Sequence, residues 1–156
     1  MNSDLEIRLL TASDVRQMRH TVLRPHQPPE KLIYPKDDIS QTFHLGGYID
    51  GLQVGIASFL YDDHSEIPDP GYQYRIRGMA TLPKYRSNKI GAKLVEEGLR
   101  IIKQNFSEAP EEKMQRVWCN ARESAFGFYE RCGFQTLGGM FEIEGIGPHK
   151  IMWREV

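Results

Sequence analysis

The chain has 156 residues, of which 40% are hydrophobic and 26% charged, the composition of a globular domain long enough to bury a core. Its formal net charge of -1 gives no overall field that would attract a nucleic acid or an anionic membrane, and no stretch has the length and hydrophobicity of a signal peptide or a transmembrane helix. We therefore expect one cytoplasmic domain over residues 1–156, with neither a nucleic acid nor a membrane as partner.

The N-terminal third predicts a strand, a helix and a hairpin. Glu6–Leu10 has the pattern of a short strand, and Thr11 with Asp14 has the pattern of a capped helix start. Pro25 ends this helix, and a long irregular connection follows. The dipeptide Asp50-Gly51, between two runs with high β-propensity, predicts a tight hairpin turn.

The remaining chain predicts strands and helices in alternation. We expect, in chain order, a strand at Gln73–Thr81, a helix at Ile90–Phe106, a solvated linker at Ser107–Lys113, a strand at Gln115–Asn120, a helix at Ala121–Cys132, and strands near Met140–Ile143 and His149–Arg154. The resulting order β-α-β-β-β-α-β-α-β-β predicts an α/β fold, a mixed central sheet with flanking helices. The last strand would form a sheet edge at which a second copy of the chain could pair.

The third helix carries signals at both ends. Asn120 with Glu123 is the residue pair of a capping box, which would start the helix after Asn120. Gly133 stands where a helix ends in a left-handed residue, and Phe134 would pack back against the helix.

Cysteine and histidine spacings predict no metal site. Cys119 and Cys132 match no zinc or CxxC pattern and are too few for a disulfide scaffold. We expect both to be reduced thiols, and a single bridge between them is the alternative. No two histidines have metal-ligand spacing.

The stretch "PKYRSNKIGAK" places cations and small residues where a strand passes into a helix. A helix start leaves backbone N–H groups without partners and carries partial positive charge, so phosphate binds well there. Close approach of a pyrophosphate needs small side chains. Here these are Ser87, Asn88, Gly91 and Ala92, with positive charge supplied by Lys84, Arg86, Lys89 and Lys93. The stretch fits neither a P-loop nor GxGxxG; an exposed basic first turn is the alternative interpretation.

A second stretch, "NARESAFGFYERCGF", follows one strand later, and in combination with the first it resembles the GNAT superfamily of N-acetyltransferases. The first GNAT signature, Gln/Arg-x-x-Gly-x-Gly/Ala after Pro-x-Tyr, is present from Arg86 to Gly91, with Lys89 in place of the middle glycine. The second is the helix that carries Tyr129 before a glycine cap. The ending "GIGPHKIMW" is similar to the terminal strand of a bacterial branch.

The resemblance implies that acetyl-CoA binds as acyl donor where two central strands separate. Backbone groups of Met79, Ala80 and Thr81 would pair with the pantetheine arm as a further strand does. The expected pyrophosphate-binding residues are Arg86, Ser87, Asn88, Lys89, Ile90, Gly91 and Ala92, and Asn120 completes the expected cofactor-binding set. Lys89 could still offer its N–H if its φ angle stays negative, and its ammonium could meet a phosphate.

The resemblance also places Tyr129 at the position of the general acid. A phenol has an ordinary pKa near 10 and a thiol one near 8.5, so Tyr129 can stay protonated and donate to the departing thiolate. A backbone N–H of the strand at Met79 would stabilise the oxyanion. From the residues alone, an amphipathic-helix tyrosine with a solvated hydroxyl remains the alternative.

The sequence does not identify a general base. His44 and His149 are candidates by pKa, although histidines in such positions are more often satisfied polar residues. Arg75 and Arg77 could receive an acidic group on the acceptor, but ion pairing within the protein is the favoured interpretation. Asp37-Asp38 could contact a cationic acceptor, although an ordinary turn is favoured.

We therefore predict an N-acetyltransferase that moves the acetyl group of acetyl-CoA directly to a primary amine. The acceptor could be a small amine, an amino acid, or the N-terminus or a lysine of a protein. One alternative is a non-catalytic acyl-CoA-binding module on the same fold. Another is a nucleotide-binding or interaction domain in which the basic turn holds a different phosphate.

Overall fold

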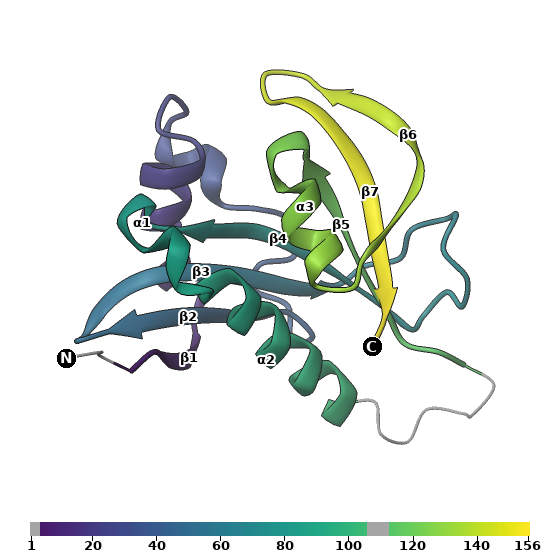
Figure 1. Ribbon diagram of the computed structural model, residues 1–156, viewed down its shortest axis with the longest axis horizontal. Helices are drawn as coiled ribbons and strands as arrows, with labels where there is room; N and C mark the ends of the chain where they lie inside the picture. Colours follow the sequence, from purple (N-terminus) through teal and green to yellow (C-terminus); the bar gives the residue numbers. More distant parts are fainter. Residues whose placement is uncertain (1–3, 106–112) are drawn as a thin grey trace. The chain divides into compact units, whose positions relative to one another are not determined.

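The computed structural model describes residues 4–105 and 113–156, and its elements follow the predicted order (Figure 1). The strands are β1 (Glu6–Leu10), β2 (Phe43–Ile49), β3 (Leu52–Tyr61), β4 (Gln73–Thr81), β5 (Arg116–Arg122), β6 (Gln135–Ile143) and β7 (Gly147–Glu155). The helices are α1 (Ala12–Met18), α2 (Ile90–Asn105) and α3 (Phe126–Arg131). Shorter helical turns cover Arg19–Leu23, Pro29–Leu32, Pro83–Asn88 and Glu123–Ala125. The α/β class and the element order are confirmed, while Phe106 and most of the predicted linker lie outside the described residues.

The chain divides into two compact units, each described here by itself. The first is Met1–Tyr61 with Ile76–Arg100, and the second is Asp62–Arg75 with Ile101–Val156. Neighbouring strands follow the order β1-β2-β3-β4 in the first unit and β4-β5-β7-β6 in the second. β4 contributes residues to both units. A single domain over residues 1–156 stays a prediction.

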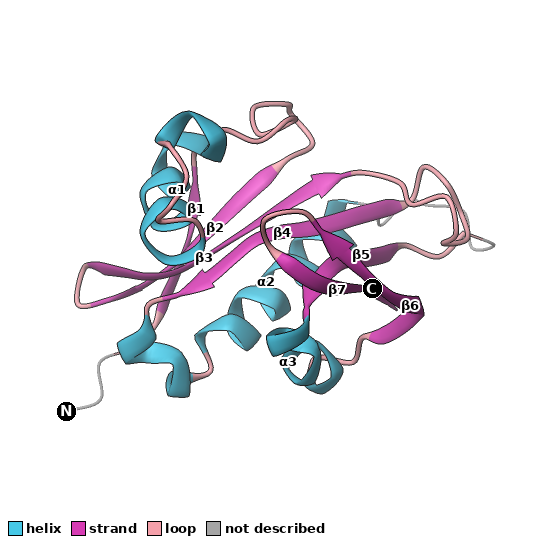
Figure 2. Ribbon diagram, turned by 90° about the horizontal axis from the view of Figure 1, so that it is seen from above, coloured by secondary structure: helices cyan, strands magenta, loops and turns pink. Residues whose placement is uncertain are grey.

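In the first unit, α1 and α2 cover opposite faces of β3 (Figure 2). Successive side chains of a strand point to opposite faces, so the apolar residues of β3 are covered on both sides. Ile56 packs with Val15 of α1 in one apolar cluster. On the other face, the Phe59 ring fills the space beside Gly98 of α2, and Gly55 lies against Ile90, where α2 begins. The start of α2 is therefore fixed by packing against the centre of β3.

Two local predictions near the N-terminus are confirmed. The Asp14 carboxylate accepts the Thr11 backbone N–H over 2.9 Å at the start of α1. The β2–β3 hairpin turns at Asp50-Gly51, which have φ angles of 50° and 79°. Both φ angles are positive, as a two-residue hairpin turn needs.

The predicted start of the third helix is wrong. Asn120 lies in β5, paired in register with Ile151 of β7, and the pairing continues to Arg122 opposite His149. A 3₁₀ turn at Glu123–Ala125 then leads into α3. Pairing with β7, a strand distant in sequence, thus extends β5 past Asn120. Asn120 is therefore a strand residue and cannot cap the helix.

The C-terminal strands differ from the prediction in length and place. β6 and β7 both begin earlier than expected, and β7 pairs with β5 on one side and β6 on the other. The last strand is therefore an interior strand of the second unit, and the expected pairing of a second copy at its edge is wrong. The predicted end of α3 is confirmed: Gly133 has a φ of 88°, and the Phe134 N–H donates to the Tyr129 carbonyl over 2.9 Å.

Candidate functional site

The expected pantetheine-binding residues lie at the C-terminal end of β4, in the first unit. Met79 and Thr81 are half-buried, and Ala80 is buried in the apolar cluster of α1 and β3. Gly78, directly before them, has a φ of 63°, so the strand is irregular at this point. The register between β4 and β5 covers Gln73–Arg75, so Met79–Thr81 lie beyond it.

The expected pyrophosphate-binding turn also lies in the first unit, between β4 and α2. A 3₁₀ turn over Pro83–Asn88 is followed by Lys89, and α2 begins at Ile90. The side chain of Ile90 is buried, and Gly91 and Ala92 are half-buried. The cations Lys84, Arg86, Lys89 and Lys93 are exposed. The four cations therefore lie outside Gly91 and Ala92 at the start of α2, while Asn88 is exposed.

Lys89 adopts a conformation that the sequence argument did not expect. Its φ of 58° and ψ of 25° lie in the left-handed region, where glycine carries no steric penalty and other residues do. The condition of a negative φ, under which Lys89 could still offer its N–H, is therefore not met. Lys89 thus has a backbone conformation that glycine, the usual residue at this motif position, adopts easily. Its N–H therefore points in the direction that a left-handed glycine would give it.

Tyr129 lies in the second unit, on α3, with 6% of its surface exposed. Its ring packs edge-on against Phe134, with ring centroids 5.2 Å apart. Its hydroxyl is hydrogen-bonded with the thiol of Cys119 on β5. Burial, with a smaller effect of that thiol, raises the pKa of Tyr129 well above its ordinary value, so the hydroxyl stays protonated at neutral pH.

The two cysteines are free thiols, as predicted. Cys119 is buried, and burial raises its pKa to about 12, with the Tyr129 hydrogen bond acting in the opposite direction. A thiol held protonated in this way is a poor nucleophile. Asn120 is half-buried beside Cys119 in β5. Asn120 and Tyr129 are the expected cofactor-binding and catalytic residues that belong to the second unit.

The two histidines proposed as bases differ in how many of their ring nitrogens have a partner. The Nδ1 of His44 is 2.7 Å from Ser58 Oγ, and its Nε2 is 3.0 Å from the Asp37 carbonyl oxygen. His149 is buried, with its Nδ1 2.8 Å from the Gly147 carbonyl oxygen. His44 is a satisfied polar residue, the interpretation that the sequence favoured, while His149 has a partner at Nδ1.

We expect His44 to make the protein less stable in mild acid. Burial lowers the pKa of His44, and the nearby guanidinium groups of Arg19 and Arg77 add to that effect, while Asp37 opposes it. Below the unfolded pKa of about 6.5 the unfolded chain binds a proton that the folded chain resists, so unfolding becomes easier as pH falls. Melting curves between about pH 7 and pH 5 should show a steeper loss in the wild type than in His44→Asn. Equal slopes would mean that His44 titrates normally in the folded protein.

The arginines of β4 are held in ion pairs within the protein, as the sequence favoured. Arg75 lies 3.5 Å from Asp62 and stacks over Trp118 in the second unit. Arg77 lies 3.1 Å from Asp37 in the first unit. Asp37 lies in a turn over residues 35–38, as the sequence favoured, and it is buried, so its carboxylate is engaged inside the protein and is not presented to an acceptor.

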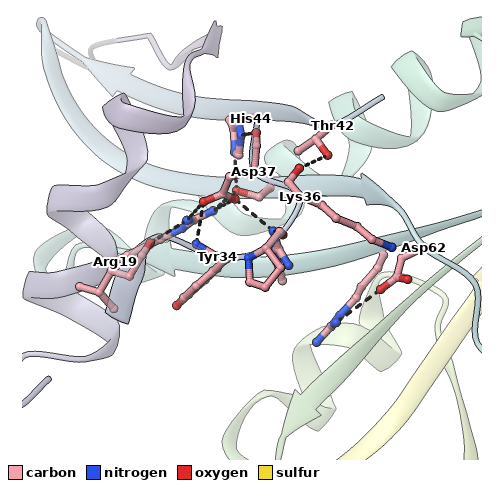
Figure 3. A network of polar contacts seen from close by, with 12 residues as sticks. Arg19, Tyr34, Lys36, Asp37, Thr42, His44 and Asp62 are labelled. Atoms are coloured by element: carbon pink, nitrogen blue, oxygen red, sulfur yellow. Dashed lines mark hydrogen bonds and ion pairs between the residues drawn. The ribbon is translucent and has the colours of Figure 1, made fainter. Parts of the chain in front are cut away.

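A further partner of Asp37 is Arg19, a residue that the sequence did not single out. Arg19 is fully buried and binds both carboxylate oxygens of Asp37, at 2.7 and 3.0 Å (Figure 3). The signal was present, because Val15, Met18, Arg19 and Val22 recur at helical spacing on one apolar face. An arginine on such a face needs a buried partner. The pKa of Asp37 is lowered: burial acts to raise it, and the two guanidinium groups and the Tyr34 N–H outweigh that effect.

The described ranges contain no helix long and apolar enough to cross a membrane. Within the same ranges, no three His, Cys, Asp or Glu residues are grouped as a metal site would require.

The sequence of this chain is similar to a family of known proteins. A family model described as "Acetyltransferase (GNAT) domain" matches residues 41–136. A relative from Bacillus subtilis (strain 168), named "Uncharacterized N-acetyltransferase YitI", is 39% identical over 150 residues, which cover 96% of this chain and 95% of the relative.

Solved structures share the fold. Escherichia coli ElaA has a TM-score of 0.73 at 21% identity, with 97% of this chain and 100% of that chain covered. An aminoglycoside 6'-N-acetyltransferase complexed with coenzyme A has a TM-score of 0.70 at 11% identity, with 96% of each chain covered.

Proposed function

Because this chain belongs to the GNAT family of N-acetyltransferases, we propose that it moves the acetyl group of acetyl-CoA directly to a primary amine. The observation that carries the proposal is the turn between β4 and α2. There the motif residues from Arg86 to Gly91 lead into a helix start whose exposed side chains include four cations, Lys84, Arg86, Lys89 and Lys93. The coenzyme A bound by the aminoglycoside acetyltransferase of the same fold supports this choice of cofactor.

The cofactor would be held mainly by backbone groups. N–H groups from Arg86 to Ala92 would donate to the pyrophosphate at the start of α2, where the helix dipole favours negative charge. The backbone of Met79, Ala80 and Thr81 would pair with the amides of the pantetheine arm. Asn120, on β5, is a further cofactor-binding residue in this proposal. The oxyanion would accept a backbone N–H of the strand at Met79.

Tyr129 would supply the proton that the leaving group needs. A neutral amine attacks the thioester carbonyl, and a C–N bond forms while the carbonyl oxygen becomes an oxyanion. As the intermediate collapses, the C–S bond breaks and Tyr129 donates its proton to the thiolate of coenzyme A. The proton left on the amide nitrogen then restores the tyrosine hydroxyl, so no separate buried base is required.

The acceptor is an amine on a small molecule, an amino acid or a protein. The solved structure of the same fold named as an aminoglycoside 6'-N-acetyltransferase supports a small molecule within this range.

Replacing Lys89 by glycine should make the protein more stable and leave cofactor affinity nearly unchanged. The left-handed backbone at Lys89 carries a penalty of roughly 1 kcal/mol that glycine avoids. Because the N–H direction is retained, the Kd for acetyl-CoA should change less than about threefold. Urea denaturation and calorimetric titration of the variant measure both quantities. A weakening beyond about tenfold, roughly 1.4 kcal/mol, would show that the lysine ammonium binds the cofactor.

Calorimetric titration of the wild type with acetyl-CoA, coenzyme A and ATP tests the cofactor. The proposal expects micromolar binding of both coenzyme A ligands and much weaker binding of ATP. Equal binding of ATP would favour a nucleotide-binding domain. Tight binding of acetyl-CoA without transfer to any amine would favour a non-catalytic acyl-CoA-binding module.

A further inference from the structure

Arg19 makes hydrogen bonds to more parts of the first unit than its ion pair with Asp37 alone would need. It belongs to the helical turn after α1, and its guanidinium is fully buried. Besides the two bonds to Asp37, Nη1 donates to the Leu32 carbonyl oxygen over 3.0 Å, and Nη2 donates to Ser58 Oγ of β3 over 2.8 Å. Figure 3 shows Arg19 and His44 directed at Asp37 from two sides.

These contacts close a ring of hydrogen bonds around Asp37. Ser58 Oγ is 2.7 Å from His44 Nδ1, and His44 Nε2 is 3.0 Å from the carbonyl oxygen of Asp37 itself. Arg77 of β4 also binds the Asp37 carboxylate and donates to the Pro35 carbonyl oxygen. The carboxylate of Asp37 is thus held by Arg19 and by Arg77 of β4, and its backbone carbonyl by His44 of β2.

The residues between the helical turn and β2, 24–42, depend on these bonds for their position. Leu32 and Asp37 are the buried residues of this segment, and Arg19 binds both. The side chains at its surface include Ile33 and Ile39, which are 53% and 41% exposed. Arg19 therefore holds, from inside the protein, a segment that exposes Ile33 and Ile39 at its surface.

Arg19 also lies against β4 beside the proposed acyl site. A Cβ placed on Gly78 would lie 3.1 Å from Arg19 Nε, so the edge of the guanidinium fills the space over that glycine. Gly78 directly precedes Met79. Arg77, which binds residues 35 and 37 of the segment, is two residues from Met79, about 7 Å along a strand.

We propose that Arg19 is a positioning residue for the amine acceptor. This rests on the proposed function. An amine that attacks a thioester held at Met79 would approach beside residues 35 and 37, because Arg77, two residues from Met79, binds both. Arg19, acting through Asp37 and Leu32, fixes the segment in the position in which the acceptor meets it.

A role in stability alone would not require this residue. A buried ion pair is often no more stabilising than apolar side chains of the same size. Arg19 instead supplies directed bonds to three different parts of the chain, which specify one position of the segment. The consequence to measure is therefore acceptor binding and not only unfolding.

The test uses Asp37→Asn, which keeps the shape of the side chain and removes the charge that orients Arg19. Arg19→Lys is the second variant, since it keeps the positive charge and loses the forked geometry. Glu30→Gln is the matched control, an equal change of charge at an exposed position of the same segment. Melting curves establish that each variant is folded at the assay temperature.

With an amine that the wild type acetylates, we expect Asp37→Asn and Arg19→Lys to raise the acceptor KM at least about tenfold, with kcat changed less than about threefold. The Kd for acetyl-CoA should stay within about threefold of the wild type. Hydrogen exchange of residues 24–42 should accelerate in both variants and not in Glu30→Gln.

An unchanged acceptor KM in folded variants, with an active wild type, would overturn the positioning role and leave the proposed function intact. A fall in kcat alone would overturn it as well, since Arg19 would then act on the chemical step. A wild type that acetylates no amine would contradict the proposed function itself, and the positioning role with it.

Discussion

Tyr129→Phe should lower kcat by about a hundredfold, because a positioned general acid contributes roughly that factor or more. Burial raises the pKa of Tyr129, so the hydroxyl is protonated and able to donate throughout the working range. Phenylalanine keeps the ring that packs against Phe134 and removes only the hydroxyl. The measurement is the steady-state rate of coenzyme A release with an acetylated amine.

The Kd for acetyl-CoA separates this effect from a general disturbance of the site, and it should change less than about threefold. Tyr72→Phe, at a half-buried tyrosine in the loop before β4, is the matched control and should keep the wild-type kcat. A turnover in Tyr129→Phe equal to the wild type would remove Tyr129 from the mechanism and leave its hydroxyl as a partner of Cys119.

Gly98→Ala should lower the free energy of unfolding by about 1–3 kcal/mol, the usual range for overpacking a core. A Cβ on this residue would lie 2.1 Å from Cζ of Phe59, a distance that no rotamer change of alanine can relieve. Phe59 is fully buried and stacks on Phe43 with ring centroids 4.9 Å apart, so its ring cannot move aside. Urea denaturation of the purified variant gives the value.

Gly127→Ala provides the matched control, a glycine-to-alanine change in α3. Its nearest neighbour within 4 Å would be the mobile end of Arg131, at 3.2 Å. Alanine is the better helix former by about 1 kcal/mol, so Gly127→Ala should be neutral or stabilising. If Gly98→Ala were equally stable, α2 would not pack on β3 in the way described.

Signals carried by neighbouring residues predicted the fold well. The turn at Asp50-Gly51 and the left-handed Gly133 each depend on bonds within a few residues, and each is confirmed. The start of α2 at Ile90 is confirmed as well, although packing against β3 fixes it. The start of the third helix was wrong because Asn120 and Arg122 pair with β7. A capping pattern cannot reveal a strand that lies far away in the sequence.

The sequence located part of the candidate site and left other parts unpredicted. The motif located the turn before α2, but the left-handed φ of Lys89 could not be read from its side chain. The bond between Arg19 and Asp37 joins residues whose positions differ by 18, and folding alone brings them together. The helical pattern indicated that Arg19 needs a buried partner, but it could not identify that partner as Asp37.

The most direct test of the proposed function is mass spectrometry of amines incubated with acetyl-CoA and the purified protein. The panel contains small amines, amino acids, and peptides with free N-termini and lysines. We predict that at least one amine gains a single acetyl group in equal amount to the coenzyme A thiol released, and that Tyr129→Phe slows its formation about a hundredfold. A folded protein that binds acetyl-CoA and yields no acetylated amine would contradict the account.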